Sequence, residues 1–202
     1  MKKAKTEVEK LKSEILDTAL DIFLTKNYSE TNIRDISERL GVTRTPIYYH
    51  FNNKYEIYSQ VVERYLEHKT VIFREILTAK EDFYVKVRND LDVCTRQAIS
   101  ENVIFSEINT NPELSAILEL REKTFDTIYG FKLDAVKEAI KNGELKADTD
   151  PNGLVDNLYL LHFGFLELSE CTYHKFSQES IDRLIDMQIE NIRRTYGTKA
   201  EG

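Results

Sequence analysis

Glycine and proline are scarce in this sequence of 202 residues, which contains only 7 Gly and 3 Pro. Few turn residues and abundant Leu, Ile, Glu, Lys and Asp favour a mostly helical protein, and little supports strands. The low glycine content argues against a Gly-rich loop that cradles phosphate, and neither a G-x-S-x-G nor an H-E-x-x-H motif occurs. The sequence therefore predicts an all-α protein that is not an enzyme.

Long apolar stretches are also missing. No stretch approaches the roughly 20 apolar residues that span a bilayer, and the charged N-terminus has no apolar secretory segment. Cys94 and Cys171 lie far apart, as expected for reduced thiols in the core of a cytosolic protein. Cys171 and His174 have a C-x2-H spacing, but two ligands do not make a zinc site. We expect a soluble cytoplasmic protein with no membrane partner, metal or cofactor.

The formal net charge of −7 hides a difference between two parts of the chain. Residues 1–54 carry 10 Lys and Arg against 8 Asp and Glu, whereas residues 55–202 carry 18 against 27. The first part is therefore slightly positive and the second clearly negative. Because phosphates are repelled by negative charge, any DNA contact is expected in the N-terminal part.

Two helices are predicted at the N-terminus. Apolar residues at spacings of three and four predict a first helix over about 8–26, with an apolar stripe formed by Val8, Leu11, Ile15, Ala19, Ile22 and Phe23. The stretch 27–29 breaks this pattern. Thr31 or Asn32 can then cap a second, short helix whose inward residues are Ile33, Ile36 and Leu40.

A sharp turn and a third short helix follow. Gly41 stands where a helix ends in the left-handed conformation, Thr43 can cap the next helix, and Pro46 falls in its first turn. The buried face of this helix is predicted to comprise Val42, Ile47 and Phe51. Three short helices with such a turn predict a helix-turn-helix unit centred on residues 41–54, with an ordinary corner between two helices as the alternative.

Longer helical patterns occupy the rest of the chain. They are predicted over 54–79, 81–101, 103–109, 112–142, 151–171 and from Ser177 to about Tyr196. The sequence therefore predicts two domains, a helix-turn-helix DNA-binding domain over 1–53 and a helical effector-binding and dimerisation domain over 54–202.

The third helix is predicted to read double-stranded DNA. Arg44 is the strongest candidate base reader, because it lies in the first turn and a guanidinium matches the O6 and N7 acceptors of guanine. Other side chains of this segment suit phosphates or thymine methyls: Thr43, Thr45, Tyr48, Tyr49, His50 and Lys54. The start of the preceding helix can hold a phosphate through Thr31, Asn32 and Arg34.

The segment TNIRDISERLGVTRTPIYYHFNNKYEIY resembles the DNA-binding region of the TetR family of bacterial transcriptional repressors. The resemblance covers residues 11–58, and the NGEL segment at 142–145 is also similar. Thr45 and Pro46 depart from the family, which often has a small residue or Gly and then Ser or Thr there. The resemblance implies that residues 43–45 supply much of the base readout, and that Tyr48, Tyr49, His50 and Lys54 contact mostly the DNA backbone.

A homodimer is expected, because one helix-turn-helix makes too few contacts to select a site in a genome. The segment 153–170 is apolar on nearly every face, and the last helix has a similar stripe. Together with their symmetry mates these helices can form a four-helix bundle, as the family resemblance also implies. The predicted interface residues are Leu158, Leu161, Phe165, Ile181, Leu184, Ile185, Ile189 and Ile192. The alternative is a monomeric core.

The helices of the second domain are rich in aromatic residues and can enclose a cavity for an unknown small-molecule effector. Its candidate residues, most of which equally suit a core, are Phe105, Phe125, Tyr129, Tyr159, His162 and Phe163. An effector bound there is expected to favour a conformer in which the helix over 54–79 displaces the DNA-reading heads and releases the palindromic operator. The alternatives are a helical protein-interaction module without DNA binding and a DNA-binding activator.

Overall fold

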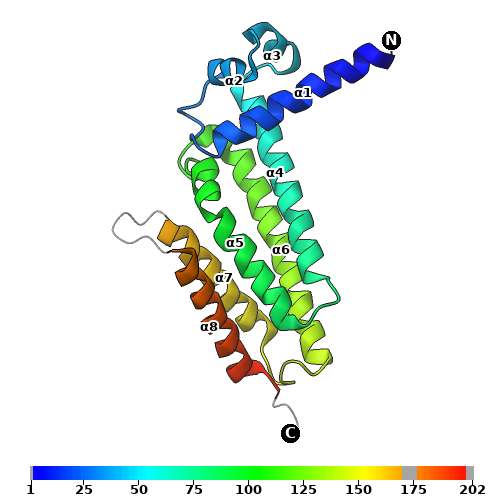
Figure 1. Ribbon diagram of the computed structural model, residues 1–202, viewed down its shortest axis with the longest axis vertical. Coiled ribbons are helices and arrows are strands. Elements are labelled where there is room, and N and C mark those ends of the chain that lie inside the picture. The colour runs from blue at the N-terminus through cyan, green and yellow to red at the C-terminus, as the bar shows by residue number, and fades with distance from the viewer. Residues whose placement is uncertain (1, 170–176, 199–202) are drawn as a thin grey trace. The chain divides into compact units, whose positions relative to one another are not determined.

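A computed structural model describes residues 2–169 and 177–198 of the chain, and no strand occurs among them. Apart from one isolated bridge between Leu145 and Gly197, the regular structure is helical. In chain order the helices are α1 (Lys2–Phe23), α2 (Ile33–Leu40), α3 (Arg44–His50), α4 (Lys54–Leu77), α5 (Phe83–Phe105), the 3-10 helix η1 (Pro112–Leu114), α6 (Ser115–Lys141), α7 (Pro151–Ser169) and α8 (Gln178–Tyr196) (Figure 1). The predicted all-α class is confirmed.

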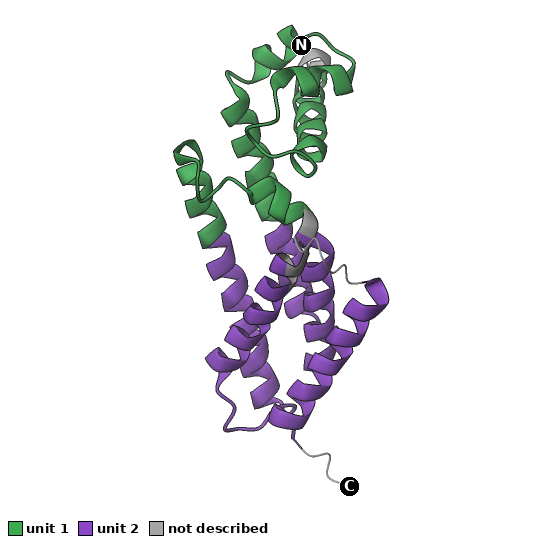
Figure 2. Ribbon diagram, turned by 90° about the vertical axis from the view of Figure 1, so that its left-hand side faces the viewer, with its two compact units in different colours: residues 1–68, 100–122 green, residues 69–99, 123–202 purple. Residues whose placement is uncertain are grey.

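The chain divides into two compact units (Figure 2). The first comprises residues 1–68 and 100–122, and the second comprises residues 69–99 and 123–202. The division passes through α4, α5 and α6, so each of these helices contributes residues to both units. The first unit therefore extends beyond the three-helix head, while the boundary at 53/54 between functional domains stays a prediction.

The core of the first unit is built around aromatic rings. The Phe23 ring meets the Tyr58 ring edge-on, with centroids 4.9 Å apart, and Tyr28 also lies 4.9 Å from Tyr58. Such tilted and edge-on arrangements are favoured by the ring quadrupoles. The buried Tyr58 hydroxyl donates a 2.6 Å hydrogen bond to the carbonyl oxygen of Ile104. These contacts join α1 and α4 to the end of α5.

Local signals set the boundaries of α2 and α3. Asn32 is the extended residue before α2, and its backbone N–H donates to Asp35 Oδ2 over 3.0 Å. Gly41 ends α2 with φ 72°, and its N–H donates to the Glu38 carbonyl oxygen. Thr43 is the extended residue before α3. The predicted left-handed turn at Gly41 is therefore confirmed, and it directs the chain from α2 into α3.

The second unit has two apolar clusters. The larger one joins α5, α6, α7 and α8 around residues such as Leu91, Val136, Leu158 and Ile185. Gly143 ends α6 with φ 77°, and Ser177 caps α8 by accepting a hydrogen bond from the Ser180 N–H. Pro151 begins α7, as predicted. These ends place α7 and α8 against the same cluster.

Several helix boundaries differ from the prediction. Helix α1 begins at Lys2, and Val8 is exposed instead of joining the apolar stripe. Helix α5 continues through residue 102, where a break between two helices was predicted. The buried Glu101 side chain accepts a hydrogen bond from the Tyr65 hydroxyl of α4. This polar residue is therefore compatible with a continuous helix. Cys171 and His174 lie outside the described residues, whereas Cys94 is buried as predicted.

Candidate nucleic-acid interface

Helix α3 presents one exposed polar face. Ile47 and the following Phe51 are buried, so they anchor the helix to the head. Tyr48 and Tyr49 on the other side are 53% and 75% exposed. Arg44 and Thr45 are exposed in the first turn. A short helix with this division of residues can enter a groove of DNA while its other face remains buried in the protein.

The Arg44 guanidinium is available for a ligand. Among the described residues, no hydrogen bond or ion pair involves it, whereas nearby Arg34 forms an ion pair with Glu38 and Arg39 forms one with Asp21. Thr43 is also exposed, and His50 is half-buried. The Tyr49 and His50 rings meet edge-on, with centroids 5.2 Å apart. The structure thus brings the predicted residues 43–45 and 48–50 together on one short segment.

Two predicted contact residues are held by the protein itself. Thr31 is only 1% exposed, and its hydroxyl donates to the Asn27 carbonyl oxygen over 2.9 Å. Lys54 Nζ donates to the Tyr28 carbonyl oxygen over 2.7 Å and lies 4.2 Å from the centre of the Tyr28 ring. The Thr31 side chain is therefore turned away from solvent, and the Lys54 ammonium stabilises the loop between α1 and α2. Asn32 and Arg34 remain exposed at the start of α2.

Acidic residues between α5 and α6 hold the same loop. Glu107 accepts hydrogen bonds from the Ser29 N–H and, over 2.6 Å, from the Ser29 hydroxyl. The Tyr28 hydroxyl donates to Glu113 Oε1 over 2.9 Å. Burial, together with Glu113, raises the pKa of this phenol well above its ordinary range, so Tyr28 is a neutral donor. The sequence did not indicate the positioning roles of Glu107 and Glu113, because no local pattern links residues about 80 positions apart.

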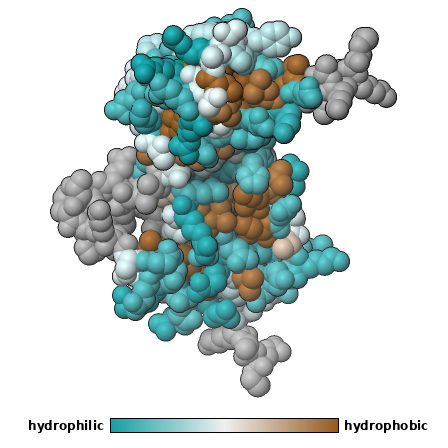
Figure 3. Space-filling model, turned by 45° about the horizontal axis from the view of Figure 1, so that its top comes forward, coloured by the Kyte–Doolittle hydropathy of each residue, from teal (hydrophilic) through white to brown (hydrophobic). Residues whose placement is uncertain are grey.

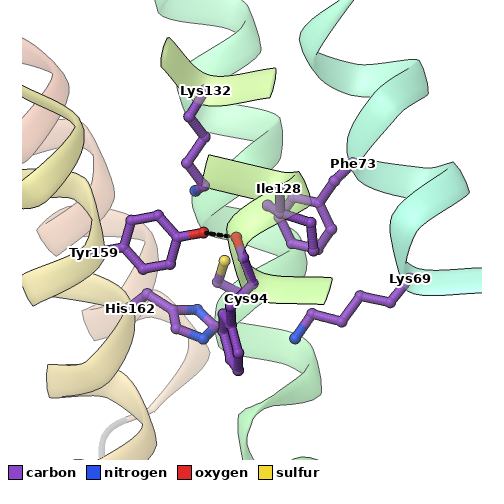
Figure 4. A pocket seen from close by; sticks show the side chains of 8 residues that line it. Lys69, Phe73, Cys94, Ile128, Lys132, Tyr159 and His162 are labelled. Atoms are coloured by element: carbon purple, nitrogen blue, oxygen red, sulfur yellow. Dashed lines mark hydrogen bonds between the residues drawn. The ribbon is translucent and has the colours of Figure 1, made fainter. Parts of the chain in front are cut away.

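A small cavity lies among four helices of the second unit (Figure 4). The described residues that line it are Lys69 and Phe73 of α4, Cys94 of α5, Phe125, Ile128 and Lys132 of α6, and Tyr159 and His162 of α7. Its internal space is about 10 Å³, which is comparable to one water molecule. The cavity is therefore very small in this structure.

Three of the six predicted pocket residues line this cavity, namely Phe125, Tyr159 and His162. Tyr129 stacks on Tyr159, with centroids 5.7 Å apart, and Phe163 lies 6.0 Å from Tyr159, so both belong to the surrounding aromatic cluster. Phe105 is placed elsewhere, in the core of the first unit. It was grouped with the others because aromatic residues at helical spacing look alike in a sequence.

An apolar groove of about 230 Å³ runs between α7 and α8. It is lined by Leu91, Leu160, Leu161, Gly164, Leu184, Ile185, Met187 and Gln188. Most of the surface in Figure 3 is hydrophilic, with a few hydrophobic patches. Leu160 and Met187 are 71% and 55% exposed, which is unusual for large apolar side chains.

The predicted interface residues divide into two groups on these helices. Leu158, Ile185 and Ile192 are buried in the apolar cluster that joins α5, α6, α7 and α8. The half-buried side chains are those of Leu161, Ile181, Leu184 and Ile189. The Phe165 side chain lies outside the described part of the structure. Both helices therefore have a buried face. Their exposed apolar residues include Leu160 of α7 and Met187 of α8, which the sequence pattern did not single out.

Comparison with known proteins identifies the head. Residues 15–61, which include α2, α3 and the junctions beside them, match the family model described as "Bacterial regulatory proteins, tetR family". Over these residues the chain is similar to the TetR family. The match covers the helix that carries Arg44, Tyr48 and Tyr49. The resemblance predicted from the sequence is therefore confirmed.

Characterised transcriptional regulators are similar to much of this chain. The "Probable acrEF/envCD operon repressor" of Escherichia coli K12 is 28% identical over 151 residues, which are 69% of this chain and 65% of that protein. The HTH-type transcriptional regulator TtgR of Pseudomonas putida is 24% identical over 159 residues, which are 74% of this chain and 75% of that protein. These relatives are transcriptional regulators and not enzymes, as predicted.

Solved structures with the same fold extend over nearly the whole chain. A protein of Saccharomonospora viridis in complex with choline superposes with a TM-score of 0.77 at 18% identity, covering 95% of this chain and 100% of that one. This similarity concerns the arrangement of the helices. Among the residues that the structure describes, no helix is long and apolar enough to cross a membrane.

Proposed function

We propose that this chain is a homodimeric transcriptional repressor that binds operator DNA through α3 and leaves it when a small molecule binds the second unit. The observation that carries the proposal is the exposed face of α3, with an accessible Arg44 guanidinium and two exposed tyrosines on a head that matches the TetR family. The protein would act in the cytoplasm, where bacterial operator DNA is found. Its operator is a palindrome in this proposal, because two identical heads read two half-sites.

The roles of the individual residues follow from their positions. Arg44 would donate to guanine O6 and N7 in the major groove, as an exposed arginine in the first turn can. Thr43, Thr45, Tyr48, Tyr49 and His50 would contact phosphates and thymine methyls. Asn32 and Arg34 would contact the DNA backbone at the start of α2. Thr31 and Lys54 would act indirectly, because each is bonded to the loop that precedes α2.

The groove between α7 and α8 would be the dimer interface. Its exposed Leu160 and Met187 lie beside half-buried Leu161 and Leu184, so a second copy of the same two helices would cover a continuous apolar strip. A self-complementary contact of this kind gives a two-fold dimer and a four-helix bundle. The buried Leu158, Ile185 and Ile192 would support these helices from inside the protomer.

Release from DNA would act through α4. This helix supplies Lys69 and Phe73 to the cavity and Lys54 to the loop before α2. A ligand that enlarges this small cavity would favour a different position of α4 and therefore of the head. Ligand and operator would then oppose each other, because each stabilises a different conformer.

Selection of genomic DNA fragments by the purified wild-type protein tests the proposal. Fragments that are retained are then titrated with wild-type protein, with the double variant Arg44→Ala and Tyr49→Ala, and with Arg96→Ala as a control for loss of an exposed arginine on α5. We expect the double variant to bind at least about thirtyfold more weakly, since two contacts of about 1–3 kcal/mol each are lost. Full-strength binding by the double variant would contradict the proposal. A reporter gene downstream of the fragment then separates repression from activation.

A further inference from the structure

The positive side chains of the three-helix head are mostly bound by the protein itself. Residues 13–54 carry 5 Lys and Arg against 6 Asp and Glu, so they have no surplus of positive charge. Three of the five form ion pairs, namely Lys26 with Asp35, Arg34 with Glu38 and Arg39 with Asp21. Lys54 donates to the Tyr28 carbonyl oxygen. Within this range, Arg44 is therefore the one Lys or Arg to which the described residues offer no hydrogen bond or ion pair.

Binding to DNA depends on more positive charge than one arginine supplies. Each Lys or Arg that neutralises a phosphate releases condensed counterions, and this release provides a large part of the affinity. The exposed Thr45, Tyr48 and Tyr49 can donate hydrogen bonds to phosphates, but these side chains are neutral. The head therefore needs further positive side chains close to α3.

The first turns of α1 contain such residues. Residues 1–12 carry 5 Lys against 2 Glu, a net charge of +3, whereas residues 13–54 have a net charge of −1. The lysines are Lys2, Lys3, Lys5, Lys10 and Lys12. Of these, Lys10 forms an exposed ion pair with Glu14 one turn later, a kind of pair that contributes little to stability. The positive charge of the N-terminal part of the chain is therefore concentrated in the first three turns of α1.

These turns begin beside α3 and extend past the apolar core. Lys12 Nζ lies 5.5 Å from the centre of the ring of Phe51, the residue that follows α3. Among the residues of α1 whose side chains the structure describes, residues 7–10 are exposed and the first buried one is Ile15. In Figure 1 this part of α1 projects beyond α2 and α3. The extension therefore contributes little to the core, and its exposed residues are accessible to a partner that α3 binds.

The length of the extension suits contacts outside the bases that α3 reads. From Lys12 to Lys2 the helix rises about 15 Å, since an α-helix rises about 1.5 Å per residue. Duplex DNA rises about 3.4 Å per step of one strand, so this length corresponds to about four base-pair steps. Contacts between lysines and phosphates carry no information about the base sequence. The extension can therefore add affinity for DNA without changing which bases are selected.

We propose that residues 2–12 form a second DNA-binding element, here called the basic arm, which binds the phosphate backbone beside the half-site that α3 reads. The inference rests on the proposed function in taking the head to dock on DNA through α3. The basic arm supplies positive charge, and Arg44 supplies the preference for particular bases. In a dimer, the two arms bind the backbone at both half-sites of the palindrome.

The test compares two full-length variants that lose the same charge. The arm variant carries Lys2→Gln, Lys3→Gln and Lys5→Gln, and it keeps Lys12 because the contact of Lys12 with Phe51 also stabilises the head. The control variant replaces three exposed lysines of α6 in the second unit by glutamine, namely Lys123, Lys137 and Lys141. Both variants and the wild-type protein are titrated over a range of salt concentrations with a selected genomic fragment and with a duplex of unrelated sequence.

We expect the control variant to lose affinity with salt as steeply as the wild-type protein. For the arm variant, the slope of the logarithm of the affinity against the logarithm of the salt concentration should be smaller by about 3 on both duplexes. This value assumes that half of the six lysines removed from a dimer contact phosphate, since each contact contributes about 0.9 to the slope. At low salt the arm variant should bind both duplexes at least about tenfold more weakly, while the ratio of the two affinities stays the same.

An arm variant with the affinity and salt dependence of the control variant would overturn the inference. Vesicles that contain an anionic lipid test a different partner, and weaker vesicle binding by the arm variant with unchanged DNA binding would also overturn it. If genomic selection retains no fragment but the unrelated duplex is bound through the arm, the proposed function fails and the basic arm stands. If Arg44→Ala loses its base preference while the arm variant behaves like the control, the basic arm fails and the proposed function stands.

Discussion

Replacing Lys132 by methionine should destabilise the second unit strongly. The Lys132 and Asp90 side chains are 3% and 1% exposed, and the ammonium contacts both carboxylate oxygens. Lys132→Met keeps most of the aliphatic chain but leaves Asp90 buried without its cation. Removing one partner of such a pair costs about 3–5 kcal/mol. For a chain of this size, that free energy corresponds to a fall of about 6–20 °C in the unfolding temperature.

Equilibrium unfolding in urea at pH 7, at one fixed protein concentration, measures this loss. A double variant, Lys132→Met with Asp90→Leu, separates the loss of the ion-pair attraction from the cost of a buried, unpaired Asp90 carboxylate. Its stability should return to within about 1–2 kcal/mol of wild type, since an apolar pair of similar volume can replace a buried ion pair. The reasoning is refuted if Lys132→Met loses less than about 1 kcal/mol, or if the double variant is no more stable than the single one.

Three further predictions follow from local geometry. Gly41→Ala should lower the free energy of unfolding by about 1 kcal/mol, because φ is 72° at this position. Gly130→Ala, inside α6 where an added Cβ meets no atom within 4 Å, should raise it by about 0.5–1 kcal/mol. Chemical denaturation of both variants checks this contrast. The Asn32 N–H, and to a smaller extent Lys26, lowers the pKa of the Asp35 carboxyl. The stability that the ionised carboxylate contributes is therefore complete above the ordinary Asp pKa near 3.8 and is lost as the pH falls through the lowered pKa. Acid unfolding of Asp35→Asn should lack this pH-dependent contribution, and identical acid profiles of the variant and the wild type would contradict the assignment. Leu160→Asp together with Met187→Asp should give monomers in analytical ultracentrifugation with unchanged helical content, and a retained dimer would place the interface elsewhere.

Local chemistry made the head predictable from the sequence. Asn32 and Gly41 act within a few residues of themselves, because a helix start or a left-handed turn depends on nearby backbone groups. Thr43 precedes α3 as predicted, but its side chain makes no capping hydrogen bond. The spacing of Ile47 and Phe51 likewise fixed which face of α3 is buried. The exposed face with Arg44 and Tyr49 followed from that division.

Contacts between distant residues were beyond such reasoning. The sequence places Thr31 beside Asn32, yet only the fold turns the Thr31 hydroxyl toward the Asn27 carbonyl oxygen. Nothing near Tyr28 indicates that its hydroxyl donates a hydrogen bond to Glu113, 85 positions away. The break predicted at residue 102 was wrong for the same reason, since the Tyr65 hydroxyl of α4 donates to the neighbouring Glu101.

The two C-terminal helices illustrate a different difficulty. Helix α7 is apolar on nearly every face, so periodicity could not separate residues that face their own core from those that face outward. Leu158 turned out to be buried and Leu160 exposed. The buried lysines of the cavity were also unexpected, because charged residues on a helix usually indicate a solvated face.

The central claim is that Arg44 reads bases from the exposed face of α3. Selection of binding sites from randomised DNA, carried out in parallel with wild-type protein and Arg44→Ala, tests it most directly. The wild-type protein should enrich a palindrome with a guanine in each half-site, and Arg44→Ala should lose the preference at that guanine by about 1–3 kcal/mol while keeping the other positions. An identical sequence preference for both proteins, or no enrichment by the wild type, would contradict the account.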